Sequence, residues 1–186
     1  MLAAGYSRRF GADKRRLQLG DGRSLLSASL ALPCSMLEEV WLVLRPDEAP
    51  AELDLPTGVR IVQNPATAQG MGHSLAAGAE RLLAESSADA VAIFLADMPA
   101  IRRDSLETLF AHAIANTIVL PSYQGKRGHP VLFGRAFWPA LERLAGDTGG
   151  QPVLRRYPAC LRTLAVADAG IHQDIDTVEA LAALEG

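Results

Sequence analysis

This chain has few aromatic residues, two cysteines and only a small excess of negative charge. Aromatics make up 5% of its 186 residues, so the core must be aliphatic, and the net charge of -3 favours neither a nucleic-acid partner nor a membrane surface. Cys34 and Cys160 fit no metal-ligand spacing, so we expect reduced thiols in a cytoplasmic protein. No apolar run is long enough to span a bilayer and we expect no signal peptide, so no membrane association is predicted.

The chain does have apolar residues in a regular order, which predicts one domain over residues 1–186. Short apolar runs predict strands at 40–44, 59–62, 90–95 and 117–120, after a first strand that ends at Leu2-Ala3-Ala4. Helical spacing predicts helices over 24–32, 72–83, 104–115, 135–144 and 177–184, with Asp104 and Thr177 as N-caps. This alternation predicts an α/β fold: a three-layer α/β/α Rossmann-like domain with a mostly parallel mixed sheet. Ligands of such sheets bind beyond the carboxyl ends of the strands, which here are the loops after Ala4, Leu95 and Leu120.

The segment LAAGYSRRFGADK, at positions 2–14, is rich in glycine and basic residues. Gly5 and Gly11 allow a close backbone approach, Ser7 offers a hydroxyl, and Arg9 and Lys14 offer positive charge, a set that suits a phosphate. The spacing matches neither GxxxxGK[ST] nor GxGxxG. A flexible basic segment without a ligand is the alternative on composition alone.

This segment resembles the LAAGxSxRxGxxK signature of nucleotidyltransferases that share the nucleotide-diphospho-sugar transferase fold. The resemblance implies a single nucleotidyltransferase domain over residues 1–186, in which the segment wraps the triphosphate of a nucleotide. Arg9 and Lys14 would then contact phosphates and act in catalysis. The implied nucleotide-binding residues of the segment are Leu2, Ala3, Ala4, Gly5, Ser7, Arg9, Gly11 and Lys14.

A carboxylate, Asp97, follows the apolar run 90–95 in the sequence Ala96-Asp97-Met98-Pro99. A carboxylate at a buried strand end needs a partner, and a divalent cation, a helix N-terminus or an arginine would each serve. The resemblance implies that Asp97 is catalytic and binds Mg²⁺, because the family carries an aspartate in an LxDMP setting. Asp176, in Asp174-Ile175-Asp176-Thr177, resembles the second metal ligand of the family, whereas Asp174 fits a helix cap equally well.

Three further segments are similar to those of molybdenum cofactor cytidylyltransferases and their near relatives. The first, NP followed by GMGHSL, contains Asn64, Gly70 and Ser74, and the resemblance implies that it lies near the base and ribose. The others, RGHPVLF and GDTGG, imply contacts to the acceptor substrate by Arg127, His129, Gly146 and Asp147. On the residues alone, the glycines could serve only tight packing, and His129, before a proline, could be a turn residue.

Taken together, the resemblance implies a Mg²⁺-dependent transfer of CMP from CTP to a molybdopterin-type cofactor, with release of pyrophosphate. A molybdenum hydroxylase apoenzyme would be a further partner. Transfer of a guanylyl group, transfer to another phosphorylated small molecule, and a non-catalytic carrier or insertion chaperone of molybdenum cofactor stay open as alternatives. Two departures from the family pattern stand out: the first strand is short, and Gln151 lies where a basic residue often follows the GDxG loop.

Overall fold

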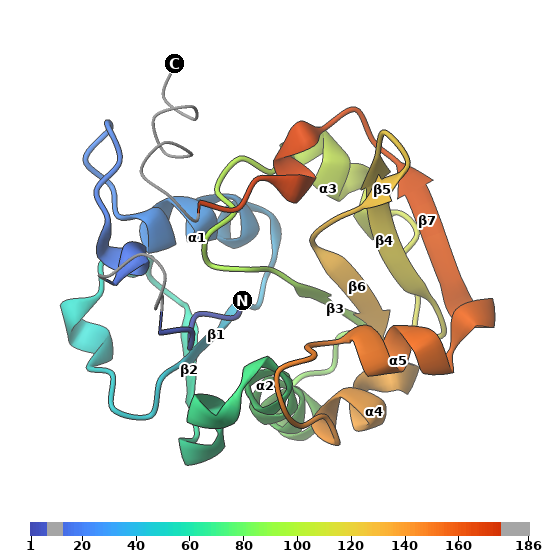
Figure 1. Cartoon of the computed structure of the whole chain (residues 1–186), viewed down its shortest axis with the longest axis horizontal. Coiled ribbons are helices and arrows are strands. Elements are labelled where there is room, and N and C mark those ends of the chain that lie inside the picture. Colours follow the sequence, from blue (N-terminus) through green and yellow to red (C-terminus); the bar gives the residue numbers. More distant parts are fainter. Residues whose placement is uncertain (7–12, 176–186) are drawn as a thin grey trace.

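The computed structural model describes residues 1–6 and 13–175, in which helices and strands alternate along the chain (Figure 1). The helices are α1 (Leu25–Met36), α2 (Met71–Glu85), α3 (Arg103–Phe110), α4 (Trp138–Glu142) and α5 (Gln151–Arg156). The strands are β1 (Trp41–Leu44), β2 (Arg60–Gln63), β3 (Ala90–Ile93), β4 (Ile118–Tyr123), β5 (Lys126–Arg127), β6 (Val131–Gly134) and β7 (Leu161–Ala165). Within the described ranges, no helix is long and apolar enough to cross a membrane.

The strands form a mixed sheet that is joined in the middle by a single residue of the first segment. β1 pairs with β2 in parallel, β4 pairs with β7 in parallel, and β6 runs antiparallel between β3 and β4. Leu2 bridges both halves, because it forms parallel bridges to Val43 and to Leu95. Its N–H donates to Phe94 O at 2.9 Å and its carbonyl accepts from Ala96 N at 3.2 Å. The segment after Leu2 therefore leaves the sheet at its centre.

Both faces of the sheet are covered by helices, as the alternation of buried side chains shows. Trp41, Val43, Ile118, Leu120 and Phe133 belong to a cluster with α2, α4 and α5 on one face. The residues between them in sequence face the other way, where Leu42 and Leu44 pack with α1, and Val119 and Leu132 pack with α3. In Figure 1, α2, α4 and α5 lie below the strands and α1 and α3 above them. The predicted three-layer α/β/α arrangement with a mixed sheet is confirmed.

The four predicted strands after the first are confirmed with small shifts, and so is the helix predicted over 72–83, which is α2. Two predictions of helix ends were wrong. Arg102 is the N-cap of α3, while Asp104 lies in the first turn and accepts a hydrogen bond from Ser105 N at 2.9 Å. α3 also ends at Phe110 rather than at 115, since the Thr117 hydroxyl binds the carbonyls of His112 and Ile114 and no buried apolar stripe continues.

The helix predicted over 135–144 is a short 3-10 helix, Arg135–Phe137, followed by α4. Strands β5, β6 and β7 and helix α5 were not predicted. β5 is joined to β4 by a two-residue turn in which Gln124 and Gly125 both have positive φ. The helix predicted over 177–184 lies outside the described residues.

Candidate functional site

The carboxyl ends of the central strands surround a cavity of about 570 Å³. The first segment, the turn after β3 and the start of α2 all reach it, as expected for ligand sites of such sheets. Its lining residues are Leu2, Ala3, Ala4, Gly5, Tyr6, Lys14, Arg15, Thr67, Ala68, Gln69, Gly70, Met71, Ser74, Leu95, Ala96, Asp97 and Asp147. We call this cavity the first cavity.

Lys14 and Asp97, 83 positions apart in sequence, form an ion pair in the first cavity, with Nζ 2.6 Å from Oδ2. Lys14 begins a 3-10 helix, Lys14–Arg16, that follows the glycine-rich segment, and Asp97 follows β3. The two side chains are 15% and 20% exposed, so the pair is largely withdrawn from water yet reachable from the cavity. The structure thus brings together the basic and acidic groups that the sequence analysis singled out.

The other carboxylate oxygen of Asp97, Oδ1, is buried and has no hydrogen-bond partner among the described residues. A buried carboxylate oxygen without a partner is costly, and a divalent cation or a ligand donor would satisfy it. The last described residue, Ile175, donates its N–H to Asp97 O at 2.9 Å. This bond brings the chain directly before Asp176 to Asp97, although Asp176 itself lies outside the described residues. The carboxylate oxygens of Asp97 therefore suit a hard cation. Within the described ranges, no group of three or more His, Cys, Asp or Glu side chains lies close enough together to hold a metal ion.

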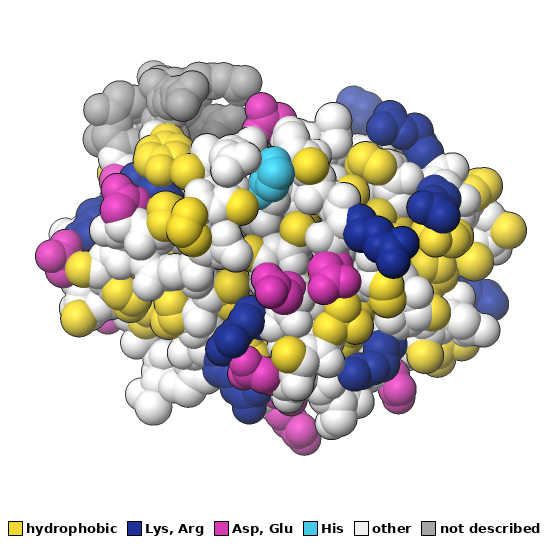
Figure 2. Space-filling view, turned by 90° about the horizontal axis from the view of Figure 1, so that it is seen from below, with side chains coloured by type: hydrophobic (Ala, Val, Ile, Leu, Met, Phe, Trp, Pro, Cys, Tyr) yellow, Lys and Arg dark blue, Asp and Glu magenta, His cyan; other side chains and the backbone are white. Residues whose placement is uncertain are grey.

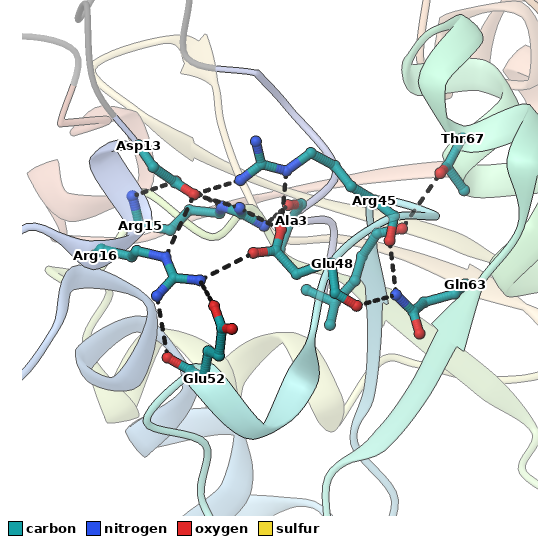
Figure 3. A network of polar contacts seen from close by, with 10 residues as sticks. Ala3, Asp13, Arg15, Arg16, Arg45, Glu48, Glu52, Gln63 and Thr67 are labelled. Carbon is teal, nitrogen blue, oxygen red and sulfur yellow. Dashed lines mark hydrogen bonds and ion pairs between the residues drawn. The ribbon is translucent and has the colours of Figure 1, made fainter.

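A network of charged side chains holds the segment around Lys14 in place (Figure 3). The guanidinium of Arg15 is 3% exposed and lies 2.5 Å from Asp13 Oδ2 and 2.5 Å from Glu48 Oε2. It also donates to Ala3 O at 2.6 Å, which ties the end of the first strand to the residues that flank Lys14. A buried arginine is tolerated here because two carboxylates and a carbonyl satisfy its donors.

Arg45, which follows β1, extends this network to the neighbouring strand. Its Nε donates to Glu48 Oε2 at 2.9 Å, and its guanidinium also pairs with Asp13. Although burial opposes the charge, the carboxylates of Asp13 and Glu48 raise the pKa of Arg45 above its usual value. The Gln63 amide donates to the carbonyls of Arg45 and Glu48, so that β2 also supports the loop (Figure 3).

The N-terminus of α2 closes another side of the first cavity, and a loop packs tightly against it. Gly72 N donates to Gly146 O at 2.7 Å. Gly70 has a φ of 132°, and a Cβ atom there would lie 2.2 Å from Asp147 Oδ1. Glycine is therefore required at 70 both by the backbone angle and by the approach of the loop. The positive end of this helix dipole faces the same cavity as Lys14, an arrangement that favours an anion.

A second cavity, of about 210 Å³, adjoins the first one and shares Leu2, Met71 and Leu95 with it. Most of its wall is apolar, and Arg127, His129 and Gln151 supply the polar side chains. The Nδ1 atom of His129 is buried and has no partner among the described residues. His129 is held in place through its backbone, because its N–H donates to Ile171 O at 3.0 Å.

Burial lowers the pKa of His129 below 6.5, although a hydrogen bond to the backbone of Ile93 and the charges of Asp97 and Asp174 act in the opposite direction. The imidazole is therefore neutral at pH 7. A neutral imidazole can accept or donate at Nδ1, depending on its tautomer, so it suits a ligand with polar ring atoms better than an anion.

Most of the predicted site residues fall into three groups. The first cavity is lined by Leu2, Ala3, Ala4, Gly5, Lys14, Gly70, Ser74 and Asp97, and also by Asp147, which was predicted on the acceptor side. The second cavity is lined by Arg127 and His129. Ser7, Arg9, Gly11 and Asp176 lie outside the described residues.

Two predicted residues do not line either cavity. Asn64 accepts a hydrogen bond from Ala66 N at 2.9 Å and thereby caps the 3-10 helix Pro65–Gln69. Gly146 instead accepts the bond from Gly72. The cavity residues Tyr6, Arg15, Thr67, Ala68, Gln69 and Met71 were missed. Of these, Tyr6 and Met71 are 43% and 45% exposed. Each follows a glycine of a predicted binding segment, and this position was the signal that could have identified it as a cavity residue.

A third cavity, of about 380 Å³, opens near the other ends of β1 and β3. Its lining is largely apolar, including Pro33, Trp41, Val91 and Leu141, with Glu38 and Glu39 as its charged residues. It has no basic side chain, so an anionic ligand fits the first cavity better. On the face that Figure 2 shows, several basic side chains lie on the right, but apolar and uncharged surface separates them from one another, so they form no continuous basic patch.

Comparison with known families agrees with this geometry: the model of the MobA-like NTP transferase domain matches residues 1–161. The chain belongs to this family. It is therefore a nucleotidyltransferase of the MobA-like NTP transferase family, whose substrates are nucleoside triphosphates. The resemblance noted in the first segment is confirmed at this level.

Two curated relatives of this NTP transferase span nearly its whole length. The purine catabolism protein PucB of Bacillus subtilis (strain 168) is 33% identical over 96% of this chain and 90% of its own length. Nicotine blue oxidoreductase of Paenarthrobacter nicotinovorans is 28% identical over 96% of this chain and 91% of its own length. A crystal structure from Mycobacterium tuberculosis, described as a complex with manganese, is 25% identical, covers 98% of this chain and 94% of that chain, and has a TM-score of 0.80.

Proposed function

We propose that this NTP transferase moves CMP from CTP to a molybdopterin-type cofactor in a Mg²⁺-dependent reaction that releases pyrophosphate. The observation that carries the proposal is the pairing of Lys14 with Asp97 in the first cavity, which adjoins the second cavity at Leu2, Met71 and Leu95. One cavity offers positive charge and a helix N-terminus for a triphosphate, and the other offers an apolar wall with a few polar groups for an acceptor.

The side chains and backbone groups of the first cavity suit the binding of a triphosphate. Lys14 would neutralise the phosphates that leave, and Arg9, outside the described residues, is proposed for the same task. The network around Arg15 would keep Lys14 and the backbone of residues 3–5 in register with the phosphates. Reactions at phosphorus depend mainly on such positioning and charge neutralisation.

Asp97 and Asp176 are proposed to hold the divalent cation, for which the unpartnered Oδ1 of Asp97 is the supporting observation. When bound, Mg²⁺ would stabilise negative charge on the phosphates that react. The relative crystallised with manganese supports a divalent cation, since its fold covers nearly this whole chain. We do not assign a role in proton transfer to His129, because a phosphate acceptor is already ionised at neutral pH.

The second cavity is proposed to receive the acceptor. Its apolar wall, made of residues such as Ile93, Leu120 and Phe133, suits a flat ring system, and the neutral His129 can form a hydrogen bond to a ring nitrogen or oxygen. Arg127 at its edge can pair with an acceptor phosphate. Gln151, which stands where the family often has a basic residue, lines the same cavity and offers it an amide.

Calorimetric titration with CTP, GTP, ATP and UTP, each with and without Mg²⁺, tests the nucleotide half of this proposal. Tight, Mg²⁺-dependent binding of CTP over the others supports it, and a preference for GTP would replace cytidylyl by guanylyl transfer. The acceptor half is tested by pyrophosphate release from CTP after addition of molybdopterin, with Asp97→Asn as the inactive control. Binding of molybdopterin without pyrophosphate release from any triphosphate would refute transfer and favour a carrier.

A further inference from the structure

The Lys14 ammonium lies on one of the two carboxylate oxygens that Asp97 could offer to a divalent cation. It is 2.6 Å from Asp97 Oδ2, and both side chains are more than three-quarters withdrawn from solvent. A divalent cation on the same carboxylate would come within a few ångströms of the ammonium, where two positive charges repel strongly because the pair is shielded from water. Full occupancy by a metal ion therefore requires the Lys14 side chain to move.

The backbone at Lys14 is held by contacts of its neighbours, so only the side chain of Lys14 has to move. Asp13 and Arg15 are locked to each other, to Glu48 and to Ala3 O. Arg16, on the other side, pairs with Glu48 and Glu52. A flexible four-carbon side chain on a rigid backbone can thus exchange one anionic partner for another within the same cavity.

We infer that Lys14 exchanges Asp97 for the triphosphate when the nucleotide binds, so that Asp97 accepts a divalent cation together with the nucleotide and only weakly before it. This inference rests on the proposed function. In the nucleotide-free protein, Lys14 acts as an internal substitute for the metal ion and keeps the carboxylate neutralised. Once phosphates attract the ammonium, Asp97 would be free of this ion pair and its carboxylate, whose Oδ1 is already unpartnered, could hold a divalent cation.

The exchange couples nucleotide and metal binding, and such coupling is reciprocal. Removal of the Lys14 charge should therefore have opposite effects on the two ligands. Binding of the nucleotide should become weaker, because the nucleotide loses a cationic contact. In the absence of nucleotide, binding of the metal should become tighter, because the metal loses a competitor. A lysine that only binds phosphate, or only stabilises the fold, would not strengthen metal binding.

The test is a titration of the nucleotide-free protein with Mn²⁺, followed by electron paramagnetic resonance of the free ion. Lys14→Met and Lys14→Gln should bind Mn²⁺ about tenfold or more tightly than the parent, within the range of roughly 5–150-fold that is typical of coupled sites. Lys14→Arg should stay close to the parent because it keeps the positive charge. Arg16→Met is the control for a general change in charge, since Arg16 is 43% exposed and its ion pairs are with Asp13, Glu48 and Glu52. Lys126→Met, at the only other lysine of the chain, is a second control and should behave like the parent.

Unchanged or weaker Mn²⁺ binding in folded Lys14→Met and Lys14→Gln would overturn the inference, and so would an equal gain in Arg16→Met. Circular dichroism and thermal unfolding establish that each variant is folded. Two substitutions of Lys14 are made so that the test can still be read if one of the two variants does not fold. A separate titration of the parent with CTP and Mn²⁺ keeps the two hypotheses apart. If the parent binds CTP but Lys14→Met gains no metal affinity, the exchange is wrong and the proposed function stands. If the parent binds no triphosphate, the proposed function itself fails.

Discussion

Replacement of Glu48 by glutamine removes one of the two carboxylates that hold the buried guanidinium of Arg15. Arg15 and Glu48 are 3% and 6% exposed and lie 2.5 Å apart, while Arg45 Nε lies 2.9 Å from the same carboxylate. The loss of one partner of a buried ion pair typically costs 3–5 kcal/mol, because the other charge stays buried. Arg15 keeps its bonds to Asp13 and Ala3, so we expect the lower end, about 3 kcal/mol.

In a chain of this size, 1 kcal/mol changes the melting temperature by about 2–4 °C, so Glu48→Gln should melt roughly 6–12 °C below the parent. Urea unfolding measured by circular dichroism gives the free energy directly. Glu52→Gln is the matched control, because Glu52 pairs with Arg16 at 3.3 Å but is 67% exposed, and such a pair contributes at most about 1 kcal/mol. Equal, small effects of the two substitutions would refute the view that a buried charge network supports the nucleotide site.

Three other substitutions test separate parts of the site. Asp97→Asn should lower kcat by about 10²-fold or more, the scale of one preorganised electrostatic contact, without unfolding the protein; near-normal turnover would remove Asp97 from the reaction. Gly72→Ala should weaken CTP binding, because its Cβ would lie 2.6 Å from Ala145 O and force the loop away from α2. Gly78→Ala on the same helix is its control, since there the nearest atom is a side-chain carbon of Val43 at 3.3 Å; equal affinities in the two variants would contradict this packing role. The pKa of His129 is near 6.5 in the unfolded chain and lower in the folded protein, so the unfolded chain binds a proton more readily. The metal-free parent protein should therefore lose stability as the pH falls below 6.5. His129→Gln should lack this part of the pH dependence, and superimposable urea-unfolding profiles at pH 7.5 and 5.5 would show that the imidazole is not buried in its neutral form.

The fold was predictable where one residue pattern dominated. The apolar run 40–44 became β1 because residues on both faces of a central strand are buried, and the helical spacing after Gly70 became α2. β6 and β7 were missed for a different reason. β6, Val131–Gly134, follows a proline and ends at a glycine, residues that are typical of turns, and β7 is largely exposed at the edge of the sheet.

Within the site, residue type and position made Lys14 and Asp97 candidates, because a lysine next to glycines and a carboxylate at a strand end suggest chemistry, whereas His129 was a candidate only through the family resemblance. Sequence patterns did not identify Arg15, although it is the buried centre of the charge network. An arginine in the run Lys14-Arg15-Arg16 reads as a solvated surface charge, and only the packing of Glu48 and Ala3 against it shows otherwise. The side chain of Asn64, which the resemblance places near the base and ribose, caps the 3-10 helix Pro65–Gln69, and its contact with a nucleotide stays a prediction.

By itself, the sequence determined the class of fold, the family signature of the first segment and the residue types available for phosphate and cation. These are local properties, because they depend on periodicity and on short spacings along the chain. Only the tertiary structure decided that Lys14 lies on Asp97 and that the loop at Gly146 closes on α2 rather than on the second cavity. Those contacts join residues more than seventy positions apart, and their geometry follows from how the sheet and helices pack, which no local pattern encodes.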